Sequence, residues 1–279
     1  MPLMRLCVMV EGQEGVTWED WLGLARACEE YGYEALFRSD HYGPVVGQEE
    51  RGSLDAWTTL AGLAAVTSTV RLGTLVSPAT FRHPSLLAKS AVSADHISGG
   101  RVEVGMGAGW NEEEHRRYGF PFPPTGERMD IFAEQLEIVH RQWRSEPFSF
   151  RGDHYQLVDC DPRPKPVQSP HPPLIVGGGG GRRSVALAAR WADEYNTVSP
   201  TPEDCRALRE RIAGACEREG REALPLSAMT RLIREPDEAL RRLGELAEAG
   251  VERVMLQHLE HTDLDVLKLI AEKVAPQLR

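Results

Sequence analysis

Residues 172–196 read PPLIVGGGGGRRSVALAARWADEYN and contain one complete strand–helix unit. The apolar run 174–176 predicts a buried strand, because strands of parallel sheets read as short continuous apolar segments. Residues 183–191 predict an amphipathic helix, and residues 194–198 predict the strand that follows it. Five consecutive glycines at 177–181 join the first strand to the helix. A tight turn needs one or two glycines, so this run requires a further explanation.

The same alternation of strand and helix extends along the chain in both directions. The expected strand and helix pairs are 6–10 with 18–31, 35–38 with 54–67, 70–76 with 84–97, 102–107 with 127–143, 174–176 with 183–191, 194–198 with 202–219, 224–231 with 237–249, and 254–258 with 264–275. Eight such units in about 250 residues are typical of a closed (β/α)₈ barrel. An open doubly wound sheet is the alternative, but it usually begins with a glycine-rich first turn, which VEGQEG at 10–15 does not provide.

A proline-rich segment at 146–173, containing DPRPKPVQSPHPP, interrupts the alternation. Proline removes a backbone donor and fixes φ, so we expect an extended connection here and not another unit. The chain is therefore expected to be one TIM-barrel domain over residues 1–279, with insertions near 108–125 and 146–173.

Composition argues against several classes of partner. The formal net charge of −10 disfavours nucleic acid and anionic membranes. The five cysteines are scattered without a CxxC pair, which favours the reducing cytoplasm over a disulfide framework or a structural zinc site. No apolar run approaches the about 20 residues that a membrane span needs. We therefore expect a cytoplasmic protein that acts on a small molecule.

Candidate functional residues lie where the expected strands end, because active sites of such barrels lie at the carboxyl ends of the strands. The residues at these positions are Glu11, Ser39, Asp40, His41, Thr74, Leu75, Val76, residues 105–111, residues 177–184, Ser199, Gln257 and His258.

The glycine run is the first candidate. It lies between a strand and a helix, where backbone N–H groups and the positive end of the helix dipole favour an anion. Arg182, Arg183 and Ser184 add charge and a hydroxyl directly after it. No P-loop lysine is present, so a single phosphate, such as that of a flavin-type ribityl chain, is the expected ligand. A merely flexible turn is the alternative.

Two further candidates follow the second and fourth strands. His41 could donate a proton or a hydrogen bond to a redox ring or a substrate, with Asp40 orienting it, although both could equally be structural. The stretch GMGAGWNEEEH at 105–115 suggests a flat ligand against the backbone, with Trp110 as a lid. Its acidic cluster and His115 lack HExxH spacing, so we expect a solvated helix start and no metal.

Several stretches resemble a known family. GMGAGWNEEEHRRYG (105–119), RPKPVQSPHPPLIVGGGG (163–180) and AARWADEYN (188–196), with VEGQEGVTWEDW (10–21) and FRSDH (37–41), are similar to the luciferase-like monooxygenase superfamily. Within it they resemble the coenzyme F420-dependent oxidoreductases, and the likeness covers nearly the whole chain.

The resemblance implies a site at the mouth of a (β/α)₈ barrel with insertions. A deazaflavin ring would lie over a bulge after the third strand, at Thr74, Leu75 and Val76, with a non-proline cis peptide at Leu75–Val76. Asp40 and His41 would lie near the polar edge of the ring. The remaining expected cofactor contacts are Gly105, Gly107, Ala108 and Asn111 for ring or ribityl, and Gly177, Gly178, Gly179, Arg182, Arg183 and Ser184 for phosphate. Glu11, Trp110 and His258 are expected in the substrate pocket.

The implied activity is hydride transfer between F420 and an unknown small organic substrate. The alternatives are an FMN-dependent monooxygenase using reduced flavin and O₂, and a non-catalytic flavin-binding protein. Related dehydrogenases of sugar phosphates carry a glutamate at the position of Trp110, so that substrate class is disfavoured. Classical luciferases place an arginine near Ala108 for the FMN phosphate, and its absence favours F420. The expected partners are a second copy of the chain, in a homodimer, and an F420 or flavin reductase.

Overall fold

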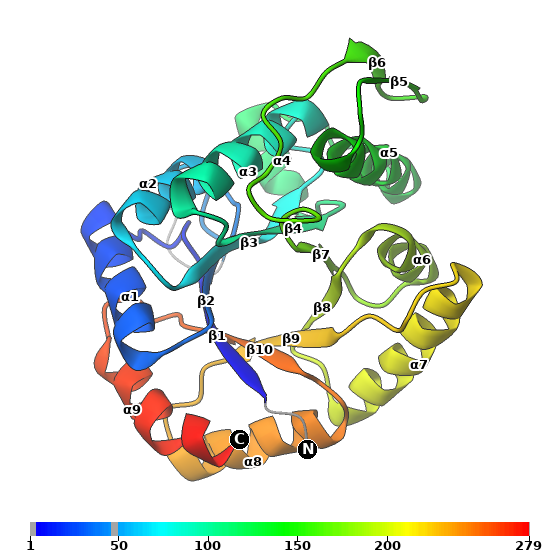
Figure 1. Cartoon of the computed structure of the whole chain (residues 1–279). Helices are drawn as coiled ribbons and strands as arrows, with labels where there is room; N and C mark the ends of the chain where they lie inside the picture. Colours follow the sequence, from blue (N-terminus) through cyan, green and yellow to red (C-terminus); the bar gives the residue numbers. More distant parts are fainter. Residues whose placement is uncertain (1–3, 46–49, 279) are drawn as a thin grey trace.

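The structure is a computed structural model that describes residues 4–45 and 50–278. Eight parallel strands form its centre: β1 (Arg5–Val10), β2 (Ala35–Arg38), β3 (Arg71–Pro78), β4 (Val102–Gly107), β7 (Leu174–Gly177), β8 (Glu194–Val198), β9 (Leu226–Arg231) and β10 (Arg253–Gln257). They close into a barrel in the order β1-β10-β9-β8-β7-β4-β3-β2 (Figure 1). The chain is a (β/α)₈ TIM barrel, as the eight repeated units predict.

Helices surround the barrel and connect its strands. They are α1 (Trp18–Tyr31), α2 (Ala56–Val66), α3 (Pro84–Ser98), α4 (Glu112–Tyr118), α5 (Thr125–Arg144), α6 (Arg182–Trp191), α7 (Pro202–Arg218), α8 (Pro236–Glu248), α9 (Asp265–Lys273) and the short 3₁₀ helix η1 (Ala275–Gln277). Local sequence sets their ends. Thr17 and Asp20 form a reciprocal capping box at the start of α1, which ends at Gly32 in the left-handed conformation.

The hydrophobic core has two layers because strand side chains alternate between the two faces of the barrel wall. One set packs outward against the helices. The inner set fills the barrel and comprises Cys7, Met9, Ala35, Phe37, Leu75, Ile175, Met229 and Met255. Val76 packs against this inner cluster, which forms the apolar base of the barrel mouth.

A buried ionic network closes the other end of the barrel. The Arg253 guanidinium lies 2.7 Å from Glu103 Oε2 and 3.2 Å from Glu194 Oε2. Burial opposes ionisation of Glu103, but Arg253 and Arg71 outweigh it and lower the pKa of that carboxyl. Burial raises the pKa of Glu194, and neighbouring Arg253 does not overcome it.

The segment 146–173 differs from the expected extended connection. It contains a two-stranded antiparallel hairpin of β5 (Phe148–Arg151) and β6 (Gln156–Cys160). The hairpin forms because Phe148 and Leu157 pack on Ile138 of α5. The backbone N–H groups of residues 153–155, which form the turn of the hairpin, donate hydrogen bonds to the Glu134 carboxylate. Tertiary packing on α5 thus outweighs the local influence of the prolines.

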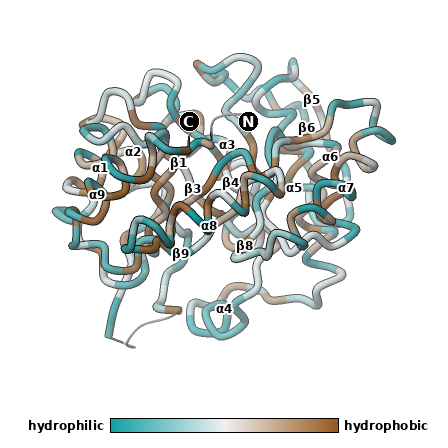
Figure 2. The backbone as a smooth tube through the Cα atoms, turned by 90° about the horizontal axis from the view of Figure 1, so that it is seen from below, coloured by the Kyte–Doolittle hydropathy of each residue, from teal (hydrophilic) through white to brown (hydrophobic). Residues whose placement is uncertain are grey.

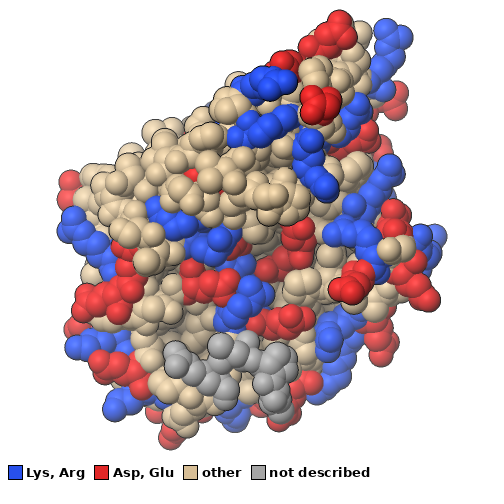
Figure 3. All heavy atoms as spheres, in the orientation of Figure 1, with Lys and Arg blue, Asp and Glu red and all other residues tan. Residues whose placement is uncertain are grey.

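The two ends of the barrel differ. Figure 2 shows both chain ends on one side and α4, which follows β4, on the opposite side. On the face that carries the chain ends, basic and acidic side chains are interspersed (Figure 3). None of the helices in the described residues is long and apolar enough to cross a membrane.

Candidate active site

The mouth of the barrel contains a bulge in β3. The register between β3 and β4 shifts between Thr74 and Ser77, and the Leu75–Val76 peptide bond is cis. Both features confirm what the family resemblance implies for this position. The Thr74 hydroxyl is buried and donates to the carbonyl of Gly105 at 3.1 Å.

Three of the predicted glycines make room for this bulge. A Cβ on Gly105 would lie 2.2 Å from the Thr74 carbonyl oxygen. A Cβ on Gly107 or Gly177 would lie 2.8 Å from a methyl group of Val76. Real Cβ atoms do not approach so closely, so each substitution would displace the bulge. The glycines of β4 and β7 therefore shape the mouth by omitting side chains.

The rest of the glycine run serves several purposes. A Cβ on Gly178 would lie 2.8 Å from the Tyr195 hydroxyl. Gly180 has φ +76°, a conformation that side chains disfavour, and its N–H donates to the same hydroxyl at 2.9 Å. Gly181 is the N-cap of α6. A Cβ on Gly179 would meet no described atom within 4 Å, so open space lies beside this one residue of the run.

The first turn of α6 differs from those of α1, α7 and α8. Those helices carry an N-cap side chain and acidic residues in the first turn. Helix α6 has no side-chain cap and begins with Arg182 and Arg183. Its uncapped N–H groups and its positive charge both favour an anion.

The polar side chains after the glycine run are not all directed toward it. Arg183 lies 2.5 Å from Asp130 and donates to the carbonyl of Gly126 at 3.0 Å. The Ser184 hydroxyl donates to the carbonyl of Gly181 at 2.9 Å. Arg182 forms no hydrogen bond or ion pair with any described residue. Arg182 thus has no partner among the described residues, whereas Arg183 is already paired with Asp130.

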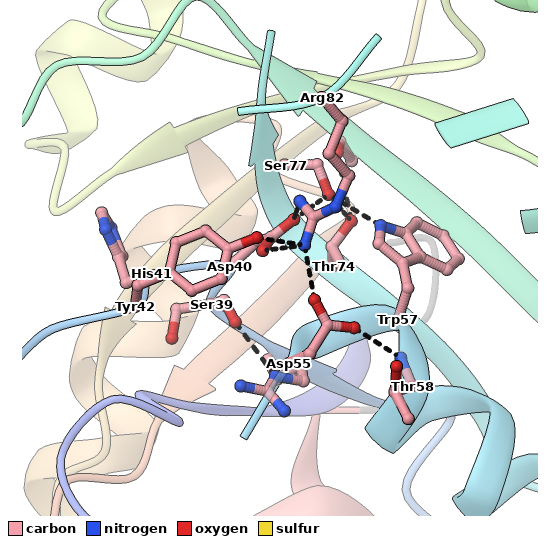
Figure 4. Close-up of polar contacts among 12 residues, drawn as sticks. Ser39, Asp40, His41, Tyr42, Asp55, Trp57, Thr58, Thr74, Ser77 and Arg82 are labelled. Atoms are coloured by element: carbon pink, nitrogen blue, oxygen red, sulfur yellow. Dashed lines mark hydrogen bonds and ion pairs between the residues drawn. The ribbon is translucent and has the colours of Figure 1, made fainter. Parts of the chain in front are cut away.

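Asp40 holds the bulge in place and does not orient His41 as expected. Its buried carboxylate forms two contacts with Arg82, at 2.5 and 3.0 Å, and accepts from Ser77 at 2.6 Å. Figure 4 shows Asp40 directed toward Arg82 and Ser77, with Asp55 bound to the same guanidinium. Because Ser77 belongs to the bulged segment of β3, this network fixes the loop after β2 to the mouth.

His41 pairs with a residue that the sequence did not single out. Its Nδ1 lies 2.6 Å from Oε2 of Glu114, the third residue of α4. Glu114 also accepts from the backbone N–H groups of Tyr42, at 2.5 Å, and Gly43, at 3.3 Å. The prediction of a solvated acidic helix start is wrong for Glu114, which is 3% exposed. Only folding brings this helix over the loop after β2, so sequence spacing gives no signal for the pair.

The pairing sets the charge of both groups. Burial opposes protonation of the His41 ring, but the hydrogen bond and the charge of Glu114 outweigh it and raise the pKa of His41. Burial likewise opposes ionisation of Glu114, but His41 and the two backbone donors lower the pKa of this carboxyl overall. The arrangement favours an imidazolium–carboxylate pair with Nδ1 engaged.

The other predicted residues occupy the rim or support it. Trp110 is 63% exposed, and its ring lies edge-on to that of His41 at 5.8 Å. The Asn111 side chain caps α4 by accepting from the N–H of Glu114 at 3.3 Å. Ala108 packs against the outer core. Glu11 accepts from Gln257 at 2.6 Å and from Gln13 at 2.9 Å. His258 follows β10 and is buried.

No group of three or more His, Cys, Asp or Glu side chains within residues 4–45 and 50–278 is arranged to hold a metal ion.

Comparison with known proteins identifies the family. The family model described as luciferase-like monooxygenase matches residues 4–267. The chain belongs to the luciferase-like monooxygenase family. An uncharacterized protein of Mycobacterium tuberculosis is 32% identical over 252 residues, covering 83% of this chain and 84% of the relative. Pyrimidine monooxygenase RutA of Stutzerimonas stutzeri is 29% identical over 245 residues, covering 85% of this chain and 66% of that protein.

Solved structures share the fold of this luciferase-like protein. An F420-dependent secondary alcohol dehydrogenase, in complex with an F420–acetone adduct, superposes with a TM-score of 0.88 at 18% identity over 100% of both chains. The oxygenating constituent of 3,6-diketocamphane monooxygenase from Pseudomonas putida, in complex with FMN, gives 0.78 at 16% identity over 99% of both chains. The family relationship supports an oxidoreductase, and these neighbours bind either a deazaflavin or a flavin.

Proposed function

We propose that this luciferase-like protein is an F420-dependent oxidoreductase that transfers a hydride between the deazaflavin and a small organic substrate. The observation that carries the proposal is the combination of two features at the barrel mouth. One is the apolar bulge at Leu75–Val76, cleared by Gly105, Gly107 and Gly177. The other is the uncapped, arginine-rich start of α6 next to it.

The bulge suits a flat aromatic ring. Val76 packs on the inner apolar cluster and is partly exposed, so it offers an apolar shelf that Gly105, Gly107 and Gly177 flank without side chains. When bound, the deazaflavin would supply two-electron hydride chemistry at its C5 atom, which the side chains of this site do not themselves provide. The shelf would fix the face of the ring that the substrate meets.

The start of α6 suits the ribityl phosphate. Gly179 leaves open space, the first-turn N–H groups have no side-chain cap, and Arg182 has no partner among the described residues. Hydrogen bonds from backbone N–H groups and a nearby arginine are the usual means of holding a phosphate. The side chains of Arg183 and Asp130 are each about half exposed. Breaking this ion pair, so that Arg183 could bind a phosphate oxygen, would therefore cost about 1 kcal/mol or less.

His41 is the proposed proton donor or acceptor. Its Nδ1 is held by Glu114, which leaves Nε2 as the ring nitrogen for the substrate. If the substrate is a carbonyl compound that is reduced, Nε2 would give its proton to the substrate oxygen. The raised pKa of His41 favours the protonated ring that this role requires.

Cofactor titration tests the proposal. The apoprotein is titrated with F420 and, separately, with FMN, and each dissociation constant is compared with that of Gly179→Ala. We expect micromolar or tighter binding of F420, at least about tenfold weaker in the variant because a methyl group would occupy the phosphate space. The unfolding temperature of the variant should equal that of the wild type, since the added Cβ meets no described atom within 4 Å.

Other outcomes separate the alternatives. Tight binding of FMN with no binding of F420 would replace this proposal with a flavin-dependent monooxygenase. Binding of F420 without turnover of any hydride donor or acceptor would instead favour a non-catalytic binding protein, whereas equal turnover by wild type and His41→Ala would remove His41 from the proposed mechanism. Failure of both cofactors to bind would overturn the proposal altogether.

A further inference from the structure

Arg231 projects from the inner face of the barrel at its mouth. It is the last residue of β9, two positions after Met229, which belongs to the inner cluster. Because successive side chains of a strand point to opposite faces, Arg231 and Met229 lie on the same face. Gln257 stands beside Arg231 on β10, and two positions before it Met255 belongs to the inner cluster.

The charge of Arg231 is uncompensated. Its side chain forms no hydrogen bond or ion pair with any described residue. Arg253, another arginine at an inner strand position, lies at the opposite end of the barrel and is paired with Glu103 and Glu194. On the next strand, β1, the register partner of Gln257 is Met9, and Glu11 follows the end of that strand. Its two carboxylate oxygens accept from Gln257 and Gln13 instead.

A cavity lies directly beside Arg231. Its volume is about 160 Å³, and its lining includes Arg231, Gln257, His258, Arg234 and Glu260. The acidic residue in this lining, Glu260, lies 3.6 Å from Arg234, which is also paired with Asp263. His258 adds a buried Nε2 atom that has no hydrogen-bond partner within the described part of the chain.

An apolar surface adjoins the same position. Val198, at the end of β8, is 59% exposed and pairs in register with Met229. Asn196, two positions earlier, reaches Met255 of the inner cluster at 3.5 Å, which places Val198 on the inner face as well. A ligand here would therefore meet an arginine and an amide on one side and an exposed aliphatic side chain on the other.

From this arrangement we infer that Arg231, with Gln257 and His258 beside it, is a subsite for a carboxylate group of a molecule bound at the barrel mouth. An arginine forms strong, directional hydrogen bonds with a carboxylate, and a neighbouring amide can donate to the same group. The carboxylate belongs either to the substrate or to the acidic tail of the cofactor. The inference does not require that F420 bind.

The test is a titration of the ¹⁵N-labelled protein with acetate, butanoate and benzoate, and with the three corresponding amides. The Arg231 Nε–H signal, assigned by its loss in Arg231→Lys, should shift with the acids and not with the amides. In Arg231→Gln the acids should bind at least about tenfold more weakly. The matched control is Arg206→Gln, which removes an exposed arginine paired with Glu203 on α7 and should leave binding unchanged.

Two further measurements distinguish the sources of the carboxylate. If it belongs to the cofactor tail, Arg231→Gln weakens F420 binding tenfold and leaves FMN binding unchanged. If it belongs to the substrate, F420 binding is unchanged and kcat/KM falls for acidic substrates compared with their amides. Equal binding of acids by wild type and Arg231→Gln, or equal binding of acids and amides by the wild type, would overturn the inference, whether or not F420 binds.

Discussion

Nδ1 of His41 lies 2.6 Å from Oε2 of Glu114, although 73 residues separate the two along the chain. The contact joins the loop after β2 to the first turn of α4, so it ties an insertion to the rim of the barrel. Two backbone N–H groups beside His41 donate to the same carboxylate. Glu114 therefore positions both the ring and the loop that carries it.

Replacing Glu114 should change the charge of His41. In Glu114→Gln we expect the pKa of His41 to fall. Burial of the ring opposes its protonation, and the variant lacks the Glu114 charge that outweighs this effect in the wild type. The ring Cε1–H signal followed by NMR against pH measures this. Glu113→Gln is the control, since Glu113 is exposed and paired with Arg116 and Arg117. An unchanged titration in Glu114→Gln would show that the pair does not set the charge.

The same pair should make stability depend on pH. The pKa of His41 is raised from 6.5, so its contribution is complete below 6.5 and is lost as pH rises through the folded-state value. The pKa of Glu114 is lowered from 4.5, so its contribution is present above 4.5 and is lost as pH falls through the folded-state value. The loss in unfolding free energy caused by Glu114→Gln should therefore be largest between pH 4.5 and 6.5. Urea denaturation across this range checks it, and a loss that grew above pH 8 would contradict it.

Gly177 and Gly179 should respond differently to the same substitution. Gly177→Ala places a methyl group against Val76 and should cost about 1–3 kcal/mol of stability, whereas Gly179→Ala should cost almost none. Val76→Ala removes the methyl groups that the new side chain would contact. The double variant Val76→Ala/Gly177→Ala should therefore lose less unfolding free energy than the sum of the losses in the two single variants. Chemical denaturation of the four proteins measures the coupling. Simple additivity would mean that Gly177 is not required by the bulge.

Asp40 and Asp55 bind the same guanidinium from different environments. Asp40 is 2% exposed, whereas the side chain of Asp55 is 39% exposed. Asp40→Asn should reduce the unfolding free energy by about 3 kcal/mol, because it breaks a buried pair. Asp55→Asn should cost about 1 kcal/mol or less. Equal losses in thermal or urea unfolding would argue against Asp40 as the anchor of the bulge.

Two of the carboxylates that pair with Arg253, those of Glu103 and Glu194, should have opposite pH effects on stability. Glu103 has a lowered pKa, so Glu103→Gln should cost about 3 kcal/mol at pH 7, an effect that shrinks as pH falls below 4.5. Glu194 has a raised pKa, so its ionised form is disfavoured in the fold at pH 7. Glu194→Gln should therefore cost less than Glu103→Gln, or stabilise, with the benefit fading as pH falls. The reverse order in urea unfolding at pH 7 would contradict this assignment.

The sequence was sufficient for the features that depend on neighbours in the chain. The period of the apolar residues predicted all eight strand–helix units of the barrel, because burial on two faces of a strand or one face of a helix leaves a local pattern. The glycine run was placed by a short motif at a strand end, whereas the bulge at Thr74–Val76 was implied by the family resemblance. The two-stranded hairpin of β5 and β6 was missed, since its stability comes from packing on α5 and not from its proline-rich surroundings.

Which side chains meet at the mouth was decided by the tertiary structure. Asp40 and His41 are adjacent in sequence, yet one binds Arg82 and the other binds Glu114. Alternation along β9 indicates that Arg231 points inward, but the lack of an acidic partner depends on how Gln257 and Glu11 pair across two other strands. The local period of a strand or helix determines which face a side chain lies on. Its partners depend on the positions of loops that follow distant strands, and only the tertiary structure sets these positions.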